Sequence, residues 1–355
     1  MTRHGDWKAI ARAALLRFAL LLAASYGLLY FADKWYAPTI GSADFTEQYY
    51  RMYQKPLDLS AAEAPFVYRQ VSAVLTHLVH ASGIYYSPST TNAMSRANPD
   101  IDQGIFFAAL LTNYLGLVLA ATIAGTIVEA ATGGLVFPLL AGLFCLLSLL
   151  SQSVVITGMT EGVSWLFVAL LYWLYGRGSR VAFGLLLLGS IFQREMISVA
   201  FALIAAFSLL LGDGRRRYNL QVLGFSVFCF AAYTMVRKVI LPAPGYEDQL
   251  TLHYLTANLA AVPALPMRDL LLQGFLSQNV LFIAVAASAV LWARTGTVPK
   301  QTIALVLAFA AIVAIGLAEG INNNVGRIGG LLTPAFAALA ALAIYRLENM
   351  PRPAR

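Results

Sequence analysis

About ten long apolar segments constrain what this chain can fold into more than any other feature. They lie near residues 13–32, 104–128, 133–152, 160–176, 180–193, 195–211, 218–240, 273–293, 301–318 and 328–346. A helix of about 20 apolar residues crosses the hydrocarbon core of a bilayer and satisfies its own backbone hydrogen bonds there. The chain is 59% hydrophobic and 12% charged, far more apolar than an average soluble domain. We therefore predict an all-α, polytopic integral membrane protein in which residues 1–355 form one domain.

Basic residues gather in the short segments that join alternate spans. With a cytoplasmic N-terminus, the cytoplasmic segments carry Arg3, Lys8, Arg12, Arg17, Arg177, Arg180, Arg215, Arg216, Arg217, Arg294, Lys300 and Arg346. This distribution follows the positive-inside rule, so the net charge of +7 orients the protein and does not indicate nucleic-acid binding. We predict cytoplasmic N- and C-termini and an uncleaved first span that serves as a signal anchor. Arg237 and Lys238 fall on the outer side and are the exceptions.

Residues 33–103 form a mostly polar outer loop after the first span, and a loop of this length is expected to carry a function. Its Asp44-Phe-Thr-Glu47 segment matches a capping box, which predicts a helix that Pro56 ends. In that helix Tyr49, Met52, Tyr53 and Phe45 would share one face. The first outer loop therefore begins with an expected amphipathic helix.

A second capping box, Ser60-Ala-Ala-Glu63, predicts another amphipathic helix in the same loop. Its apolar stripe would consist of Val67, Val71, Val74, Leu75 and Leu78. The opposite face would carry Arg69, Thr76, His77 and His80. Two histidines without a third ligand do not define a metal site, so we expect His77 and His80 to be surface residues.

Gln193-Arg194-Glu195 interrupts the apolar stretch from 181 to 211, which is too long for one straight span. The polar residues predict two short helices that meet at an outer hinge. Charges at such a depth usually pair, line a cavity or contact a substrate. Arg194 and Glu195 could form a purely structural pair, but neighbours in a helix point about 100° apart, which favours separate partners.

Two further segments place charges on the outer side. Glu319-Gly-Ile-Asn-Asn-Asn-Val-Gly-Arg327 joins the last two spans, and Arg327 could grip a phosphate at a helix start or contact only lipid headgroups. Glu161 opens the fourth span and could be only a favourable charge at a helix N-terminus. Asp44 likewise could be an N-cap alone, or a carboxylate that takes a proton from an acceptor hydroxyl.

The joint placement of these groups on one membrane face predicts a polar outer cavity. Its members are Asp44, Arg69, Glu161, Arg194, Glu195, Glu319 and Arg327. Arginines there suit a phosphate-bearing lipid, and carboxylates suit proton transfer.

Four segments, in order, resemble the bacterial polytopic membrane glycosyltransferases of the GT-C class. These are Asp44-Phe-Thr-Glu-Gln-Tyr-Tyr, Pro65-Phe-Val-Tyr-Arg69, Arg194-Glu195 with its apolar run, and Asn324-Val-Gly-Arg327 with Thr333-Pro334. The resemblance covers about residues 13–346. Unlike better-defined members, the chain has no paired-acid motif in the loop, and it ends soon after the last span.

The resemblance implies a fold of about ten membrane helices with a large helical first outer loop, in a bacterial inner membrane. It implies transfer of a sugar from a polyprenyl-phosphate-linked donor to a lipid-linked or glycan acceptor of the cell envelope, on the periplasmic face. Asp44 matches the catalytic acid position, and Arg69, Arg194 and Arg327 match donor contacts. Glu161, Glu195 and Glu319 complete the expected substrate-binding set. No cofactor is implied with certainty, and a divalent cation is left open.

Two other functions use the same residues. A transporter or flippase of a lipid-linked saccharide would bind without chemistry, through groups that line a path across the membrane. A noncatalytic subunit of a polysaccharide-assembly complex would use the outer loop to dock an envelope-assembly protein. We expect contacts with membrane lipids in each case, and no nucleic acid.

Overall fold

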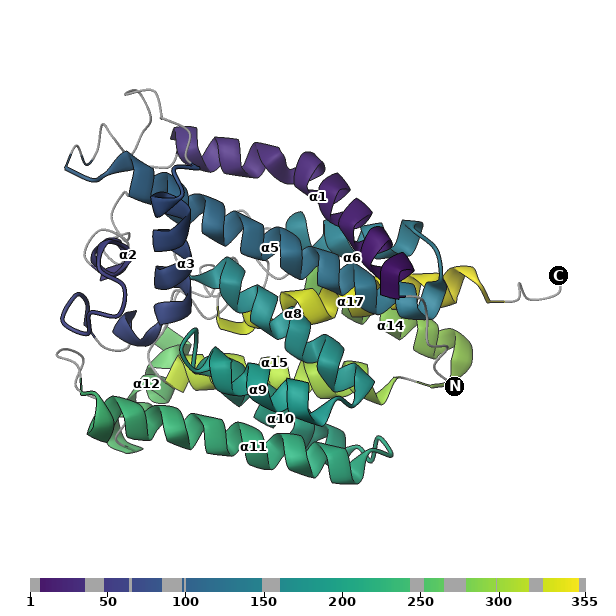
Figure 1. Cartoon of the computed structure of the whole chain (residues 1–355). Helices are drawn as coiled ribbons and strands as arrows, with labels where there is room; N and C mark the ends of the chain where they lie inside the picture. Colours follow the sequence, from purple (N-terminus) through teal and green to yellow (C-terminus); the bar gives the residue numbers. More distant parts are fainter. Residues whose placement is uncertain are drawn as a thin grey trace.

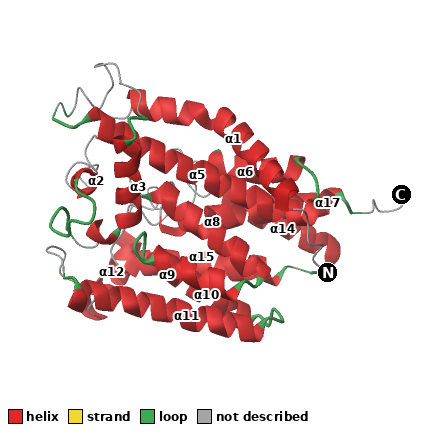
Figure 2. Cartoon of the chain, viewed as in Figure 1, coloured by secondary structure: helices red, strands yellow, loops and turns green. Residues whose placement is uncertain are grey.

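The structure is a computed structural model, and it describes residues 7–35, 48–63, 66–84, 98, 100–148, 160–242, 252–264, 279–297, 299–318 and 328–350. These residues form helices and joining loops without any strand, as Figure 2 shows, so the all-α prediction is confirmed for this part of the chain. Within it, five helical segments are long and apolar enough to cross a membrane: Ala11–Lys34, Gln103–Thr132, Arg216–Ile240, Lys300–Ala318 and Gly330–Glu348.

The long helices run side by side and give the molecule two distinct ends (Figure 1). They are α1 (Trp7–Trp35), α5 (Gln103–Thr132), α11 (Arg216–Met235), α15 (Lys300–Ala318) and α17 (Thr333–Glu348). Helix α1 begins and α17 ends at what we call the terminal end. At the opposite end, the loop end, lie α2 (Tyr50–Gln54) and α3 (Gln70–Ala81), with α3 lying across the direction of the long helices.

Shorter apolar helices fill the space between the long ones. They are α6 (Val136–Leu146), α8 (Glu161–Arg177), α9 (Arg180–Ser190), α10 (Met196–Leu210) and α14 (Asn279–Thr295). Helix α12 (Leu252–Ala261) lies at the loop end. Helices α9 and α10 meet at residues 191–195, which confirms the polar hinge predicted between two short helices.

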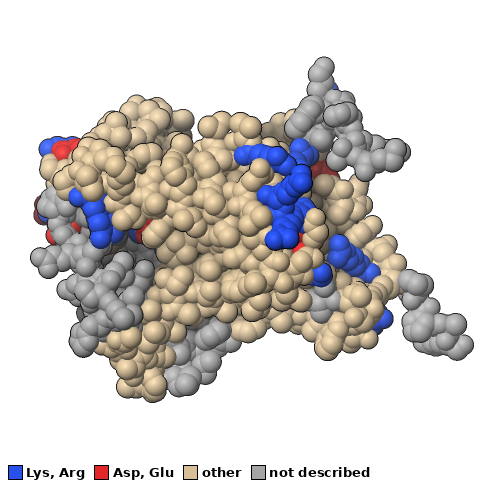
Figure 3. Space-filling model, turned by 90° about the horizontal axis from the view of Figure 1, so that it is seen from below, with Lys and Arg blue, Asp and Glu red and all other residues tan. Residues whose placement is uncertain are grey.

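Charged side chains are absent from the middle of one face of the bundle. On the face seen in Figure 3, Lys and Arg gather at both ends, and the broad band between them carries no charged side chain on its described surface. Exposed residues of the long helices include large apolar ones, for example Val227 and Phe228 of α11. Such a band is what lipid tails would cover.

Helices α5 and α8 approach each other unusually closely because glycines face each other. A Cβ at Gly162 would lie 1.9 Å from the backbone oxygen of Asn113, and one at Gly116 would lie 2.7 Å from the backbone of Gly162. The Asn113 side chain accepts a hydrogen bond from the Gly162 N–H. Small residues allow this kind of approach between helices in membranes. The contact fixes the start of α8, and with it Glu161.

Replacing Gly162 with alanine should therefore destabilise the protein. The added methyl group meets rigid backbone, and overpacking of this kind costs about 1–3 kcal/mol or more. Gly176→Ala is the matched control, because it lies on the same helix and its Cβ would meet nothing within 4 Å. Apparent Tm in detergent measures both variants. An unchanged Tm for Gly162→Ala would show that the two helices are not held at this distance.

The second loop helix differs from the sequence prediction in its start. Ser60 does not cap a helix, because both its backbone N–H and its hydroxyl donate to the Asp58 side chain, at 2.9 and 2.6 Å. These bonds hold a local turn instead, and α3 begins at Gln70. The shorter first helix agrees with prediction in the part that is described, since Tyr49, Met52 and Tyr53 are all buried. Phe45 lies outside the described residues.

Helix α3 packs with part of its polar face inward. Leu75 and Leu78 of the apolar stripe are exposed, with Leu78 58% exposed, whereas Arg69 and Thr76 are buried. Here the part of the bundle that α3 covers is itself polar, so the polar face of α3 packs inward and forms hydrogen bonds there.

Candidate functional site at the loop end

Four of the seven predicted site residues lie in the described chain, and they come together at the loop end. Arg69 precedes α3, Glu161 begins α8, and Arg194 and Glu195 lie in the hinge before α10. Asp44, Glu319 and Arg327 lie outside the described residues.

Arg194 pairs with Glu161, which belongs to another helix. Arg194 Nη1 lies 3.4 Å from Glu161 Oε1, and the two residues are 6% and 1% exposed. Glu161 Oε2 also accepts the Thr160 N–H at 3.1 Å, which ties the carboxylate to the start of its own helix. The pairing confirms that Arg194 finds a partner other than the adjacent Glu195.

The side-chain amide of Gln193 joins three segments, which are the hinge, the start of α8 and α3. Its Nε2 donates to the Thr160 carbonyl at 2.8 Å and to Ser164 Oγ at 3.0 Å. Its Oε1 accepts from the backbone N–H and the hydroxyl of Ser72, at 3.1 and 3.0 Å. Gln193 is fully buried, so each of these bonds is shielded from water. The sequence analysis gave Gln193 no role of its own, although a buried amide beside two charges signals a network.

One donor of the Arg69 guanidinium group has a partner, and another has none within the described chain. Its Nη1 donates to the hydroxyl of Tyr49, and its guanidinium carbon lies 5.3 Å from the centre of the Phe66 ring. The Nε atom is buried and forms no hydrogen bond within the described chain. A guanidinium donor left unsatisfied in this way suits an oxygen of a carboxylate or phosphate, the groups that arginine can bind through two parallel hydrogen bonds.

The electrostatic surroundings keep Arg69 charged although it is only 8% exposed. Burial disfavours the charged form, but Tyr49, Glu195 and Glu161 more than offset that cost, so the pKa of Arg69 is raised. Burial also raises the pKa of Tyr53, with smaller contributions from Tyr49 and Glu161, so its hydroxyl stays protonated. The site thus combines two guanidinium groups, two carboxyl groups and tyrosine hydroxyls.

The described residues contain no group of three His, Cys, Asp or Glu side chains that could hold a metal ion. His77 Nδ1 lies 3.3 Å from the Tyr53 carbonyl oxygen, and His80 Nε2 lies 3.8 Å from Asp102 Oδ2. Both histidines are partly buried, so they hold α3 against its neighbours and are not simple surface residues.

Comparisons of the chain with models of known protein families, with curated proteins and with solved structures found no match.

Proposed function

We propose that the protein is a membrane glycosyltransferase that uses a polyprenyl-phosphate-linked sugar donor. The observation that carries this proposal is the buried Arg69 Nε, which has no hydrogen-bond partner within the described chain, beside the Arg194–Glu161 pair. A buried cation with an unsatisfied donor suits a phosphate group better than a neutral ligand. Its position at one end of an apolar bundle suits a phosphate attached to a lipid.

The proposal includes the finer points of the topology. The chain crosses a bacterial inner membrane about ten times, as in the GT-C class, with both termini cytoplasmic and the loop end in the periplasm. The described helices that are shorter than a full span would cross with the help of their flanking residues. The acceptor is a lipid-linked or glycan component of the cell envelope, and an envelope-assembly protein could bind the outer loop.

The chemistry is a single inverting displacement at the anomeric carbon. The acceptor oxygen forms a bond to that carbon while the bond from the carbon to the phosphate oxygen breaks. The acceptor proton goes to Asp44, and the departing polyprenyl phosphate gains one negative charge. Arg69 contacts that phosphate, together with Arg327, and stabilises the added charge.

Arg194 has a supporting role in this scheme because Glu161 already neutralises it. The pair holds the start of α8 against the hinge before α10, beneath α3. The negative charge of Glu195 offsets the positive charge of Arg69. The remaining acid, Glu319, is a candidate contact for the sugar hydroxyls.

Asp44→Asn tests the proposed base. In proteoliposomes with a panel of polyprenyl-phosphate-linked sugars, it should lower transfer about 10²–10⁴-fold, the usual contribution of a general base. Glu47→Gln is the control, because it removes an acid three residues away in the sequence. Undiminished transfer by folded Asp44→Asn would exclude the assigned role. Donor that crosses the bilayer unchanged would favour a flippase, and copurification of a partner without turnover would favour a noncatalytic subunit.

A further inference from the structure

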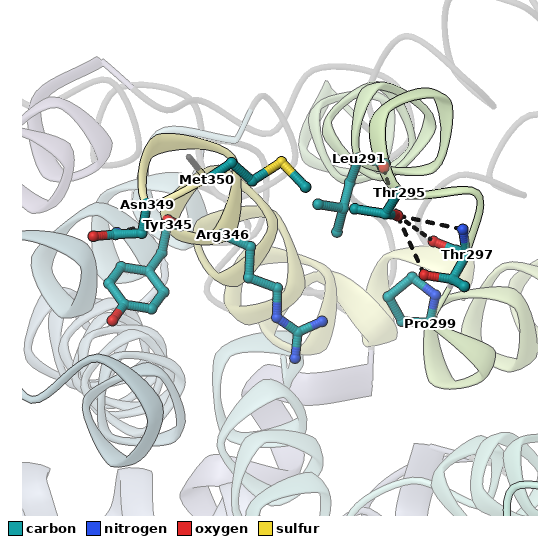
Figure 4. A pocket seen from close by; sticks show the side chains of 8 residues that line it. All are labelled: Leu291, Thr295, Thr297, Pro299, Tyr345, Arg346, Asn349 and Met350. Atoms are coloured by element: carbon teal, nitrogen blue, oxygen red, sulfur yellow. Dashed lines mark hydrogen bonds between the residues drawn. The ribbon is translucent and has the colours of Figure 1, made fainter. Parts of the chain in front are cut away.

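A hollow of about 580 Å³ lies at the terminal end of the bundle, far from the loop-end site. Figure 4 shows it between the last turn of α17 and the turn that joins α14 to α15. Leu291 and Met350 give it an apolar wall, and the Thr297 and Thr295 side chains lie along one edge. The two threonine hydroxyl oxygens lie 3.2 Å apart, and Thr295 also donates to the Leu291 carbonyl at 2.8 Å, so this edge is ordered.

Arg346 is the charged residue among those that line the hollow. Its guanidinium group extends between α17 and the Thr297–Pro299 side (Figure 4). Within the described chain it makes no ion pair or hydrogen bond. The nearest acid in sequence, Glu348, lies two residues further along, about 200° around the helix, and so faces away. The hollow therefore combines an apolar wall with the guanidinium group of Arg346, which has no partner within the described chain.

The surroundings place this hollow at the boundary between lipid tails and water. On α14, Val290 and Trp292 are exposed, with Trp292 55% exposed, and tryptophan is enriched at membrane interfaces. Arg294 follows Trp292 by two residues, and Lys300 begins α15 after the joining turn. Phospholipid phosphates lie at this depth, where clustered basic residues attract anionic lipids.

We infer that this hollow binds the headgroup of an anionic phospholipid. Arg346 donates hydrogen bonds to the phosphate, and the glycerol end of the lipid packs against Leu291 and Met350. The apolar wall is what favours a lipid over free phosphate, because an exposed arginine alone holds a small anion only weakly in water. This inference does not depend on the proposed transfer activity.

Native mass spectrometry of the full chain in detergent tests the inference. Dioleoyl phosphatidylglycerol should bind in preference to dioleoyl phosphatidylcholine, and Arg346→Gln should lower its apparent affinity about tenfold, the effect of losing one charge-assisted hydrogen bond. Arg217→Gln is the control, since it removes an exposed basic residue outside the hollow and should leave affinity unchanged. Met350→Glu keeps Arg346 but adds a carboxylate to the hollow, and it should cause a similar loss.

Three outcomes would overturn the inference. Equal losses in Arg346→Gln and Arg217→Gln would mean that phosphatidylglycerol binds a diffuse basic surface. Displacement of the lipid by an equal concentration of inorganic phosphate would identify a free-phosphate site. Equal binding of both phospholipids would remove the selectivity for an anionic headgroup.

Discussion

Arg69→Lys should reduce sugar transfer about 10²–10³-fold, the effect of removing one donor that stabilises developing negative charge. Lysine keeps the positive charge but lacks the planar fork, so it cannot bond Tyr49 and still offer two parallel donors to a phosphate. The loss should appear mainly in kcat, because the phosphate gains its extra charge only as the donor bond breaks. Steady-state transfer in proteoliposomes measures the change.

Arg51→Lys provides the matched control for this prediction, because Arg51 lies on α2 close in sequence and is exposed. It should retain full transfer. Comparable transfer by Arg69→Lys and Arg51→Lys, with both proteins folded, would remove Arg69 from the reaction. A loss in Arg69→Lys accompanied by a lower Tm would instead point to a structural role.

Glu161→Gln should strongly destabilise the fold, by roughly 3–5 kcal/mol, the usual effect of leaving one member of a buried ion pair without its partner. The buried Arg194 would then face a neutral amide in place of the Glu161 carboxylate. The hydrogen bond that Gln193 donates should weaken as well, because its acceptor is the carbonyl of Thr160, the residue next to Glu161. Thermal or denaturant unfolding in detergent measures the loss.

The double variant Glu161→Gln, Arg194→Gln tests whether the loss of stability comes from an uncompensated charge or from altered packing. Removing both charges leaves no uncompensated ion, so it should recover much of the stability that Glu161→Gln loses. If the double variant is as unstable as the sum of the two single ones, the 3.4 Å contact contributes no coupling energy. The ion pair would then not be what joins α8 to the hinge.

The sequence pattern predicted the helices well, because a backbone exposed to lipid must satisfy its own hydrogen bonds and a helix is one of the few structures that does so. The α9–α10 hinge at residues 191–195 followed from length, since a continuous apolar stretch from 181 to 211 exceeds one bilayer. Arg194 pairs outside its own hinge, as predicted, but the helix geometry used for that prediction does not apply, because Arg194 and Glu195 lie in the hinge before α10 and not in a helix. Its partner, Glu161, could not be derived, because the Gly116–Gly162 approach that sets the start of α8 is a tertiary contact.

The α3 region shows where local reasoning fails. The Ser60 capping box competes with the Asp58 turn, and nothing in the local pattern decides between them. The apolar stripe of α3 does not identify its buried face, because Gln193 and the charges beneath α3 set the inward face. Gln193 and Tyr49 were therefore missed as polar partners, since their importance arises only when the segments meet.

The location of the lipid phosphate tests the central proposal most directly. A structure of the full chain in lipid nanodiscs with added polyprenyl phosphate should place a phosphate oxygen about 2.7–2.9 Å from Arg69 Nε or Nη2. The Arg69→Lys protein, prepared in the same way, should show weak or no phosphate there. Phosphate bound elsewhere on the protein, with Arg69 Nε still without a partner, would contradict the account.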